Sequence, residues 1–130
     1  MYSLDTNIII DFLRGENGAV RKIEELKQTH ILSITPIVLS ELYKGAFLGA
    51  RQEEIFSTVE QFSKSLVFLE YTEEACKIFG EKFAELKKIG KPTEESDLMI
   101  ASICIAKDSI LVTKNYKHFK DIKGLRLLAV

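Results

Sequence analysis

The sequence has no tryptophan and only two cysteines, two prolines and two histidines. Two isolated cysteines, Cys76 and Cys104, are too few for a disulfide scaffold or a cysteine-based metal cluster. Both lie in apolar helical runs, so we expect buried, reduced thiols. Reduced thiols are typical of a cytosolic protein.

Long apolar runs are also missing. No basic segment followed by an apolar stretch opens the chain, as it would in a secretory signal. The longest apolar run, Leu98 to Ala106, is far shorter than the roughly 20 residues that span a bilayer. The formal net charge is only -1, so attraction to nucleic acid would have to come from a local patch. We therefore expect a cytoplasmic protein with no membrane association.

Short apolar runs alternate with amphipathic segments along the whole chain. The expected strands are Tyr2–Asp5, His30–Ile34, Leu66–Glu70, Ile110–Thr113 and Leu125–Leu128. The expected helices are Asn7–Leu13, Gly18–Gln28, two that form a hairpin between Thr35 and Lys64, Thr72–Ile89 and Asp97–Lys107, and a basic loop covers Lys114–Lys123. Strands that are apolar throughout indicate a parallel sheet covered on both faces. We predict one three-layer α/β domain spanning residues 1–130.

Three of the 19 acidic residues occupy unusual positions. Asp5 ends an apolar strand, where ligands bind in open α/β sheets. Glu41 lies within an apolar helix, and Asp97 lies in the first turn of the most apolar helix. Helix capping and the helix dipole offer a structural explanation for Asp5 and Asp97. Glu41 has no such explanation.

Four segments, in this order, resemble the signatures of the PIN-domain family. They are Leu-Asp5-Thr-Asn, Ser-Glu41-Leu-Tyr-Lys-Gly-Ala, Glu-Ser-Asp97-Leu-Met-Ile-Ala-Ser and Leu-Val-Thr113-Lys-Asn115-Tyr-Lys-His-Phe. Within that family the chain most resembles the VapC-type toxins of type II toxin–antitoxin systems, from its first strand to its last. The resemblance implies a Rossmann-like sheet with strand order 3-2-1-4-5, an acidic metal site and ribonuclease activity that depends on Mg²⁺ or Mn²⁺.

The chemistry of three carboxylates agrees with that resemblance. Converging at about 4 Å, they would repel by roughly 4 kcal/mol per pair at an effective dielectric of about 20. Oxygen ligands suit a hard cation such as Mg²⁺ or Mn²⁺, which can activate water for phosphodiester hydrolysis. We expect Asp5 and Asp97 to bind the metal directly, and Glu41 to bind through water or to orient the attacking water. The residues expected to fix these carboxylates by hydrogen bonds are Thr6, Thr113 and Asn115.

One position departs from the family pattern. Many PIN domains carry a fourth acid just before the phenylalanine that is Phe119 here, and this chain has His118 in that place. A neutral imidazole lowers the negative charge of the site, which makes a second metal less secure. Orienting water, contacting a phosphate and an ordinary surface position are the open roles for His118.

Basic residues flank the predicted site. Between Lys107 and Arg126 there are six Lys or Arg against two Asp. Such a rim would neutralise RNA phosphates without reading sequence, although a solvated loop is the alternative. The candidate RNA contacts are Arg14, Lys44, Lys114 and Lys117.

The predicted hairpin has more apolar residues than one buried stripe requires. They gather near its tip and are Phe47, Leu48, Ile55 and Phe56. An exposed apolar patch indicates a partner surface. We expect a homodimer interface and, as the resemblance implies, a groove for a VapB-type antitoxin.

Two other functions are possible. A phosphatase with an aspartyl nucleophile would need a second acid two residues after Asp5, but Asn7 occupies that position. A non-catalytic PIN module that binds RNA or a protein partner is the second alternative. The presence of all three acids argues against it, while His118 leaves it open.

Overall fold

A computed structural model describes all 130 residues. Five strands form one sheet with the order β3-β2-β1-β4-β5, and every neighbouring pair is parallel. The strands are β1 (Tyr2–Leu4), β2 (Leu32–Ile34), β3 (Val67–Phe68), β4 (Ile110–Thr113) and β5 (Leu127–Ala129). The predicted strand order is therefore confirmed, and β1 lies at the centre of the sheet.

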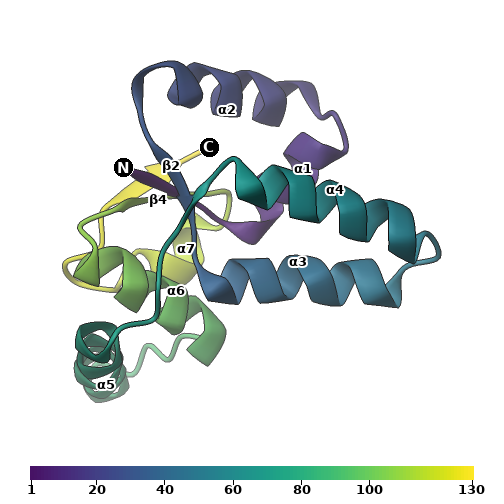
Figure 1. Cartoon of the computed structure of the whole chain (residues 1–130). Coiled ribbons are helices and arrows are strands. Elements are labelled where there is room, and N and C mark those ends of the chain that lie inside the picture. The colour runs from purple at the N-terminus through teal and green to yellow at the C-terminus, as the bar shows by residue number, and fades with distance from the viewer.

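Helices cover both sides of this sheet. They are α1 (Thr6–Leu13), α2 (Asn17–Thr29), α3 (Pro36–Leu48), α4 (Gln52–Lys64), α5 (Glu73–Lys88), α6 (Glu95–Ala106) and α7 (Tyr116–Phe119). Figure 1 shows α2 above the sheet, α5 and α6 below it, and α3 with α4 as a hairpin that projects to one side. The three-layer arrangement and the hairpin match the prediction. No helix combines the length and apolar character needed to cross a bilayer.

The predicted start signals are present in the structure. Thr35 precedes α3, and its hydroxyl accepts a hydrogen bond from the backbone N–H of Val38 at 3.2 Å, with Pro36 as the first helical residue. Thr72 caps α5 in the same way, accepting from the N–H of Ala75 at 3.2 Å. Both caps satisfy N–H groups that have no partner within the helix.

The core is centred on α6. Its buried residues point to nearly every side of the helix, as the apolar sequence predicted, and they include Leu98, Ile100 and Cys104. The expectation that Cys76 is buried is wrong, because Cys76 is exposed. It follows the buried Ala75 on α5, but lies a quarter turn away on the face that also carries the exposed Glu73.

Several predicted segments differ from the structure, among them β2, which begins at Leu32 and not at His30, and α6, which begins at Glu95 and not at Asp97. The strand expected at Leu66–Glu70 shrinks to β3, whose two residues are 45% and 51% exposed because β3 forms an edge of the sheet. The expected loop Lys114–Lys123 contains the helix α7. A helix of four residues is not stable alone, and Phe119, buried to 1% exposure, attaches it to the core. The last strand begins two residues later than expected, at Leu127.

A row of buried hydroxyl groups crosses the three central strands. Ser3 on β1 contacts Ser33 on β2 at 2.6 Å and Ser109, just before β4, at 2.9 Å between hydroxyl oxygens. Ser33 also donates to the carbonyl of Tyr2, and Ser109 donates to the carbonyl of Met1, each at 3.2 Å. Because a slip by one residue would break every one of these bonds, the row fixes the register of β1 against both neighbours.

Candidate active site

Asp5 lies where β1 ends and α1 begins, at the centre of the sheet. Its backbone N–H donates to the carbonyl of Val112 on β4 at 3.0 Å. One carboxylate oxygen, Oδ1, accepts from the N–H of Thr6 at 2.8 Å, and the other, Oδ2, accepts from the hydroxyl of Thr113 at 2.7 Å. The residue is 5% exposed. Asp5 therefore caps α1. Its buried carboxylate is also held in one orientation by residues at the ends of β1 and β4.

Glu41 reaches the same region from the middle of α3. Its Oε1 accepts a hydrogen bond from the hydroxyl of Thr6 at 3.0 Å. Burial raises the pKa of the Glu41 carboxyl, and the nearby charges of Asp5 and Asp97 raise it further, whereas the Thr6 hydrogen bond and Lys44 act to lower it. A glutamate held partly out of water beside two other acids has no structural reason to be there.

Asp97 comes from the first turn of α6. Burial raises the pKa of its carboxyl and the charge of Asp5 adds to this, while His118 opposes the shift. The Nδ1 atom of His118 lies 3.3 Å from Oδ2 of Asp97. His118, on α7, is therefore a partner of Asp97, which makes it more than an isolated surface residue.

The three predicted carboxylates come from the end of β1, from α3 and from α6, and each lies near enough to another for its charge to act on that neighbour. As they are placed, no three acids, histidines or cysteines are close enough to form a closed metal cage. This fits Mg²⁺, which keeps several waters and uses only one or two carboxylates. Burial is the main cause of the raised pKa values of Glu41 and Asp97, and the negative charge of neighbouring acids, which a cation would offset, adds to both. The donor set therefore fits a hydrated divalent cation, and the roles of these residues as ligands stay predictions.

The supporting residues divide into two kinds. Thr6 and Thr113 hold the carboxylates through their hydroxyl groups, as the sequence predicted. Asn115 acts differently, because its backbone N–H donates to the hydroxyl oxygen of Thr113 at 2.9 Å. Since that oxygen already accepts a hydrogen bond, its own hydrogen is free to point at Asp5. The Asn115 side chain makes no hydrogen bond to the carboxylates.

The candidate RNA contacts do not all lie together. Lys117 lines a cleft of about 280 Å³, without apolar lining, that also contains Asp97 and His118. Arg14 lines a second cavity of about 300 Å³ beside Glu41, and Lys44 is close enough to Glu41 to lower its pKa. One of these cavities therefore includes Glu41 and the other includes Asp97.

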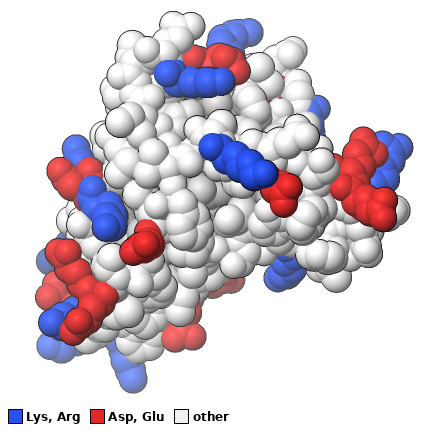
Figure 2. Space-filling model, viewed as in Figure 1, with Lys and Arg blue, Asp and Glu red and all other residues white.

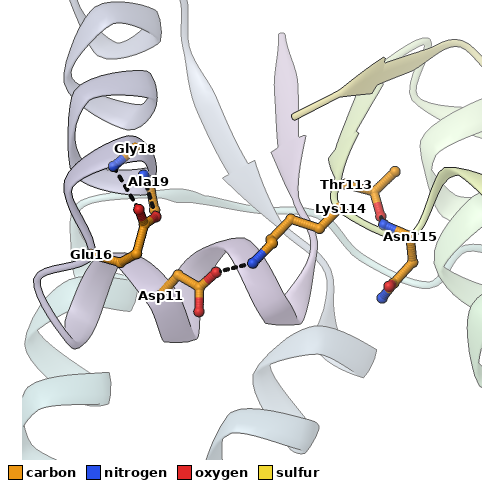
Figure 3. A network of polar contacts seen from close by, with 7 residues as sticks. All are labelled: Asp11, Glu16, Gly18, Ala19, Thr113, Lys114 and Asn115. Atoms are coloured by element: carbon orange, nitrogen blue, oxygen red, sulfur yellow. Dashed lines mark hydrogen bonds and ion pairs between the residues drawn. The ribbon is translucent and has the colours of Figure 1, made fainter.

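Lys114 is placed differently. Its ammonium pairs with the carboxylate of Asp11 on α1, as Figure 3 shows, and this hydrogen bond raises the pKa of Lys114. In the same figure Glu16 caps α2, accepting from the N–H groups of Gly18 at 2.8 Å and Ala19 at 2.7 Å. No role for Asp11 or Glu16 was predicted from the sequence. Asp11 has no local signal in the sequence, because its partner lies 103 residues away.

The rest of the surface offers no competing charged site in the view of Figure 2. Lys and Arg side chains alternate there with Asp and Glu around a largely uncharged centre. The largest cavity, about 530 Å³, lies between α2, the end of α4 and the edge of the sheet, and none of the three carboxylates lines it. The chemistry is therefore concentrated at the carboxyl ends of β1 and β4.

Comparison with known proteins agrees with this geometry. The family model described as the PIN domain matches residues 2–125. The chain belongs to the PIN-domain family. It is 31% identical over 127 residues to ribonuclease VapC1 of Haemophilus influenzae strain R2866, covering 97% of this chain and 95% of the relative. It is 32% identical over 125 residues to the tRNA(fMet)-specific endonuclease VapC of Shigella flexneri, covering 96% and 94%.

Solved structures place this PIN domain among the same relatives. VapBC2 from Rickettsia felis, bound to a DNA fragment from its promoter, matches with a TM-score of 0.92 and 31% identity over 99% of this chain and 98% of that chain. VapBC from Salmonella typhimurium, also bound to DNA, matches with a TM-score of 0.89 and 30% identity over 98% and 96%. Sequence and fold therefore both place this PIN domain beside the VapC proteins.

The raised pKa values predict how metal-free protein responds to pH. A carboxyl group whose pKa is raised in the native protein binds more protons there than it does in the unfolded chain. The free energy of unfolding therefore falls as the pH rises from the pKa of the unfolded chain through the pKa of the native protein. Glu41→Gln removes this cost and keeps an oxygen that accepts from Thr6. We expect the variant to melt a few degrees above wild type at pH 7.5 and at the same temperature near pH 4, by thermal unfolding without metal.

The matched control is Glu53→Gln, which changes an exposed glutamate on α4. Its melting temperature should follow wild type at both pH values. A Glu41→Gln protein that melts below wild type at pH 7.5 would show that Glu41 stabilises the fold and would contradict the prediction.

Proposed function

We propose that this PIN domain is a metal-dependent endoribonuclease that hydrolyses RNA phosphodiester bonds and acts as the toxin of a toxin–antitoxin pair. The observation that carries the proposal is the convergence of Asp5, Glu41 and Asp97, with two of the three pKa values raised. Relatives named ribonuclease and tRNA(fMet)-specific endonuclease support the reaction class. The solved VapBC structures support the toxin role.

In this proposal Asp5 and Asp97 hold Mg²⁺ or Mn²⁺. The bound cation would activate water and neutralise charge that develops on the phosphate. Thr113 and the N–H of Thr6 keep the Asp5 carboxylate fixed in orientation. Glu41 accepts from Thr6 through Oε1, which leaves Oε2 to orient the attacking water and take its proton. A glutamate with a raised pKa is suited to that transfer.

The surrounding cations would hold the RNA backbone. Lys117 lies beside Asp97 in the polar cleft, and Arg14 and Lys44 lie on the Glu41 side. RNA crossing the carboxylates would thus meet positive charge on both sides, which gives affinity without reading sequence.

The experiment that tests the proposal is RNA cleavage in the presence of Mg²⁺, of Mn²⁺, and of EDTA. We expect cleavage with either cation, loss of cleavage with EDTA and recovery when Mg²⁺ is added in excess, followed on a labelled RNA by gel electrophoresis. Cleavage that persists in EDTA would contradict the metal mechanism. RNA binding with no cleavage under any condition would favour the non-catalytic module instead.

We further propose a homodimer and a VapB-type antitoxin as partners, both served by the α3–α4 hairpin. The hairpin tip exposes Phe47 at 58% and Leu48 at 79%, although both are large and apolar. Phe56 packs against Tyr43 and Phe47, with ring centroids 5.0 Å and 5.8 Å apart. Ring contacts thus hold the exposed Phe47 against Phe56, and Phe56 against Tyr43. A fixed, exposed apolar surface of this kind is suited to binding a partner.

The substitution Leu48→Lys tests this surface without disturbing the core. Lysine is compatible with the last residue of a helix, so the fold should be kept. We expect the dimer to dissociate at concentrations at least about tenfold higher than for wild type, measured by sedimentation velocity. Ile89→Lys, at the exposed end of α5, is the matched control and should not change association. Identical association of Leu48→Lys and wild type would remove the hairpin tip from the interface.

A further inference from the structure

Four consecutive residues at the end of β4 are used to hold β1 and α1. The carbonyl of Val112 accepts from the backbone N–H of Asp5 at 3.0 Å. The hydroxyl of Thr113 donates to Oδ2 of Asp5 at 2.7 Å. Lys114 pairs with Asp11, one and a half turns along α1, and the N–H of Asn115 donates back to Thr113. Val112, Thr113 and Lys114 therefore each make a polar contact with Asp5 or with α1.

Lys114 points away from the proposed RNA path. It lines a cavity with Glu16, Ala129 and other residues of α2 and β5, and none of the three carboxylates contributes to that cavity. Asp11 and Glu16 both act on the Lys114 ammonium, and Figure 3 shows it directed at α1. A phosphate that approached Lys114 would meet two carboxylates of its own charge. This position is poor for binding RNA.

The Lys114–Asp11 pair is well placed to hold the Thr113 hydroxyl. Thr113 ends β4, and the chain turns at once into α7, whose first turn lacks a side-chain cap from Asn115. The Asn115 N–H holds the Thr113 hydroxyl and the Val130 N–H holds the Thr113 carbonyl at 3.1 Å, but neither of these bonds comes from the α1 side. An ion pair to α1, the helix that Asp5 itself caps, ties this turn to the same rigid element as the carboxylate.

We propose that Lys114 and Asp11 are positioning residues for Asp5, acting through Thr113, and that Lys114 does not contact RNA. The inference rests on the proposed function, since it concerns the carboxylate assigned to the metal. It replaces the expectation from sequence that Lys114 is part of the RNA-binding rim.

The test uses full-length protein with Lys114→Met, with Asp11→Asn, with both, and with Lys114→Arg, which keeps the ion pair. Lys22→Met is the control, because it breaks an exposed ion pair of 3.7 Å to Glu25 on α2. Amide hydrogen exchange of Asn115 and Thr6, measured by NMR without metal, reads the hydrogen bonds directly. Steady-state RNA cleavage with Mg²⁺ gives kcat and KM.

We expect each single variant to speed exchange at Asn115 about fivefold and to lower kcat by a similar factor with KM unchanged. The double variant should be no worse than either single one, because both remove the same pair. Lys114→Arg and Lys22→Met should match wild type in exchange and in kcat.

Two results would overturn the inference. The first is unchanged exchange at Asn115 and Thr6 in Lys114→Met and Asp11→Asn. The second is a rise in KM for Lys114→Met together with a fall in KM for Asp11→Asn. That pattern would mean that Lys114 binds an RNA phosphate and that Asp11 competes with the phosphate for Lys114. If wild type cleaves no RNA with Mg²⁺, the proposed function fails, and the exchange data alone decide the positioning role.

Discussion

Asp5→Asn is expected to lower kcat/KM for RNA cleavage by at least about 10³-fold while leaving the fold intact. The substitution keeps the size of the side chain and an oxygen that accepts from the N–H of Thr6. It removes the negative charge that lies between the two strands at the centre of the sheet. The raised pKa values of Glu41 and Asp97 depend in part on that charge, so their carboxyl groups should ionise more easily in the variant.

The measurement combines cleavage of labelled RNA, Mg²⁺ binding by calorimetry and a thermal melt. Asp108→Asn is the matched control, because Asp108 is an exposed acid whose positive φ of 52° asparagine also tolerates. We expect the control to cleave like wild type and Asp5→Asn to lose Mg²⁺ affinity. Full activity of Asp5→Asn would refute the assignment of Asp5 to the metal.

Thr113→Val is expected to lower activity by about 10- to 100-fold, the range typical when a group that holds a metal ligand is removed. Valine matches the shape of threonine, so the fully buried site stays filled. The loss of the hydroxyl leaves Oδ2 of Asp5 without its donor and the N–H of Asn115 without its acceptor. The carboxylate can then rotate away from the geometry that the cation requires.

The separating control is Thr113→Ser, which keeps the hydroxyl and loses only a methyl group. It should retain most of the activity, although it leaves a small cavity. Kinetics at several Mg²⁺ concentrations should show that Thr113→Val needs more metal for half-maximal rate than Thr113→Ser does. Equal rates for the two variants would mean that the hydrogen bond to Asp5 has no role in catalysis.

The sequence predicted the sheet and most helices because their signals are local. Thr35-Pro36 and Thr72 identify helix starts within a few residues, and apolar runs such as Ile110–Thr113 identify strands. The strand order needed the PIN-domain resemblance, because which strands become neighbours is decided by packing over the whole chain. Asp5, Glu41 and Asp97 stood out by their positions in apolar segments, and the resemblance then assigned them to one metal site.

The features that sequence analysis missed depend on contacts between distant residues. α7 is too short to show helical periodicity, and it exists because Phe119 is buried. The pairing of Lys114 with Asp11 joins residues 103 positions apart, so the basic loop suggested an RNA contact where the structure has an ion pair. Cys76 was misplaced because one residue along a helix is enough to turn a side chain from the core to solvent.

The central position of β1 has a consequence for how the protein is made. The hydroxyl that holds Asp5 is synthesised 108 residues after it, as part of β4. β1 can pair with β4 only after β4 has left the ribosome, because folding that joins distant segments must wait for both. Under the proposed function, a nascent or prematurely terminated chain has no assembled site. A chain that ends before β4 lacks the hydroxyl that holds Asp5.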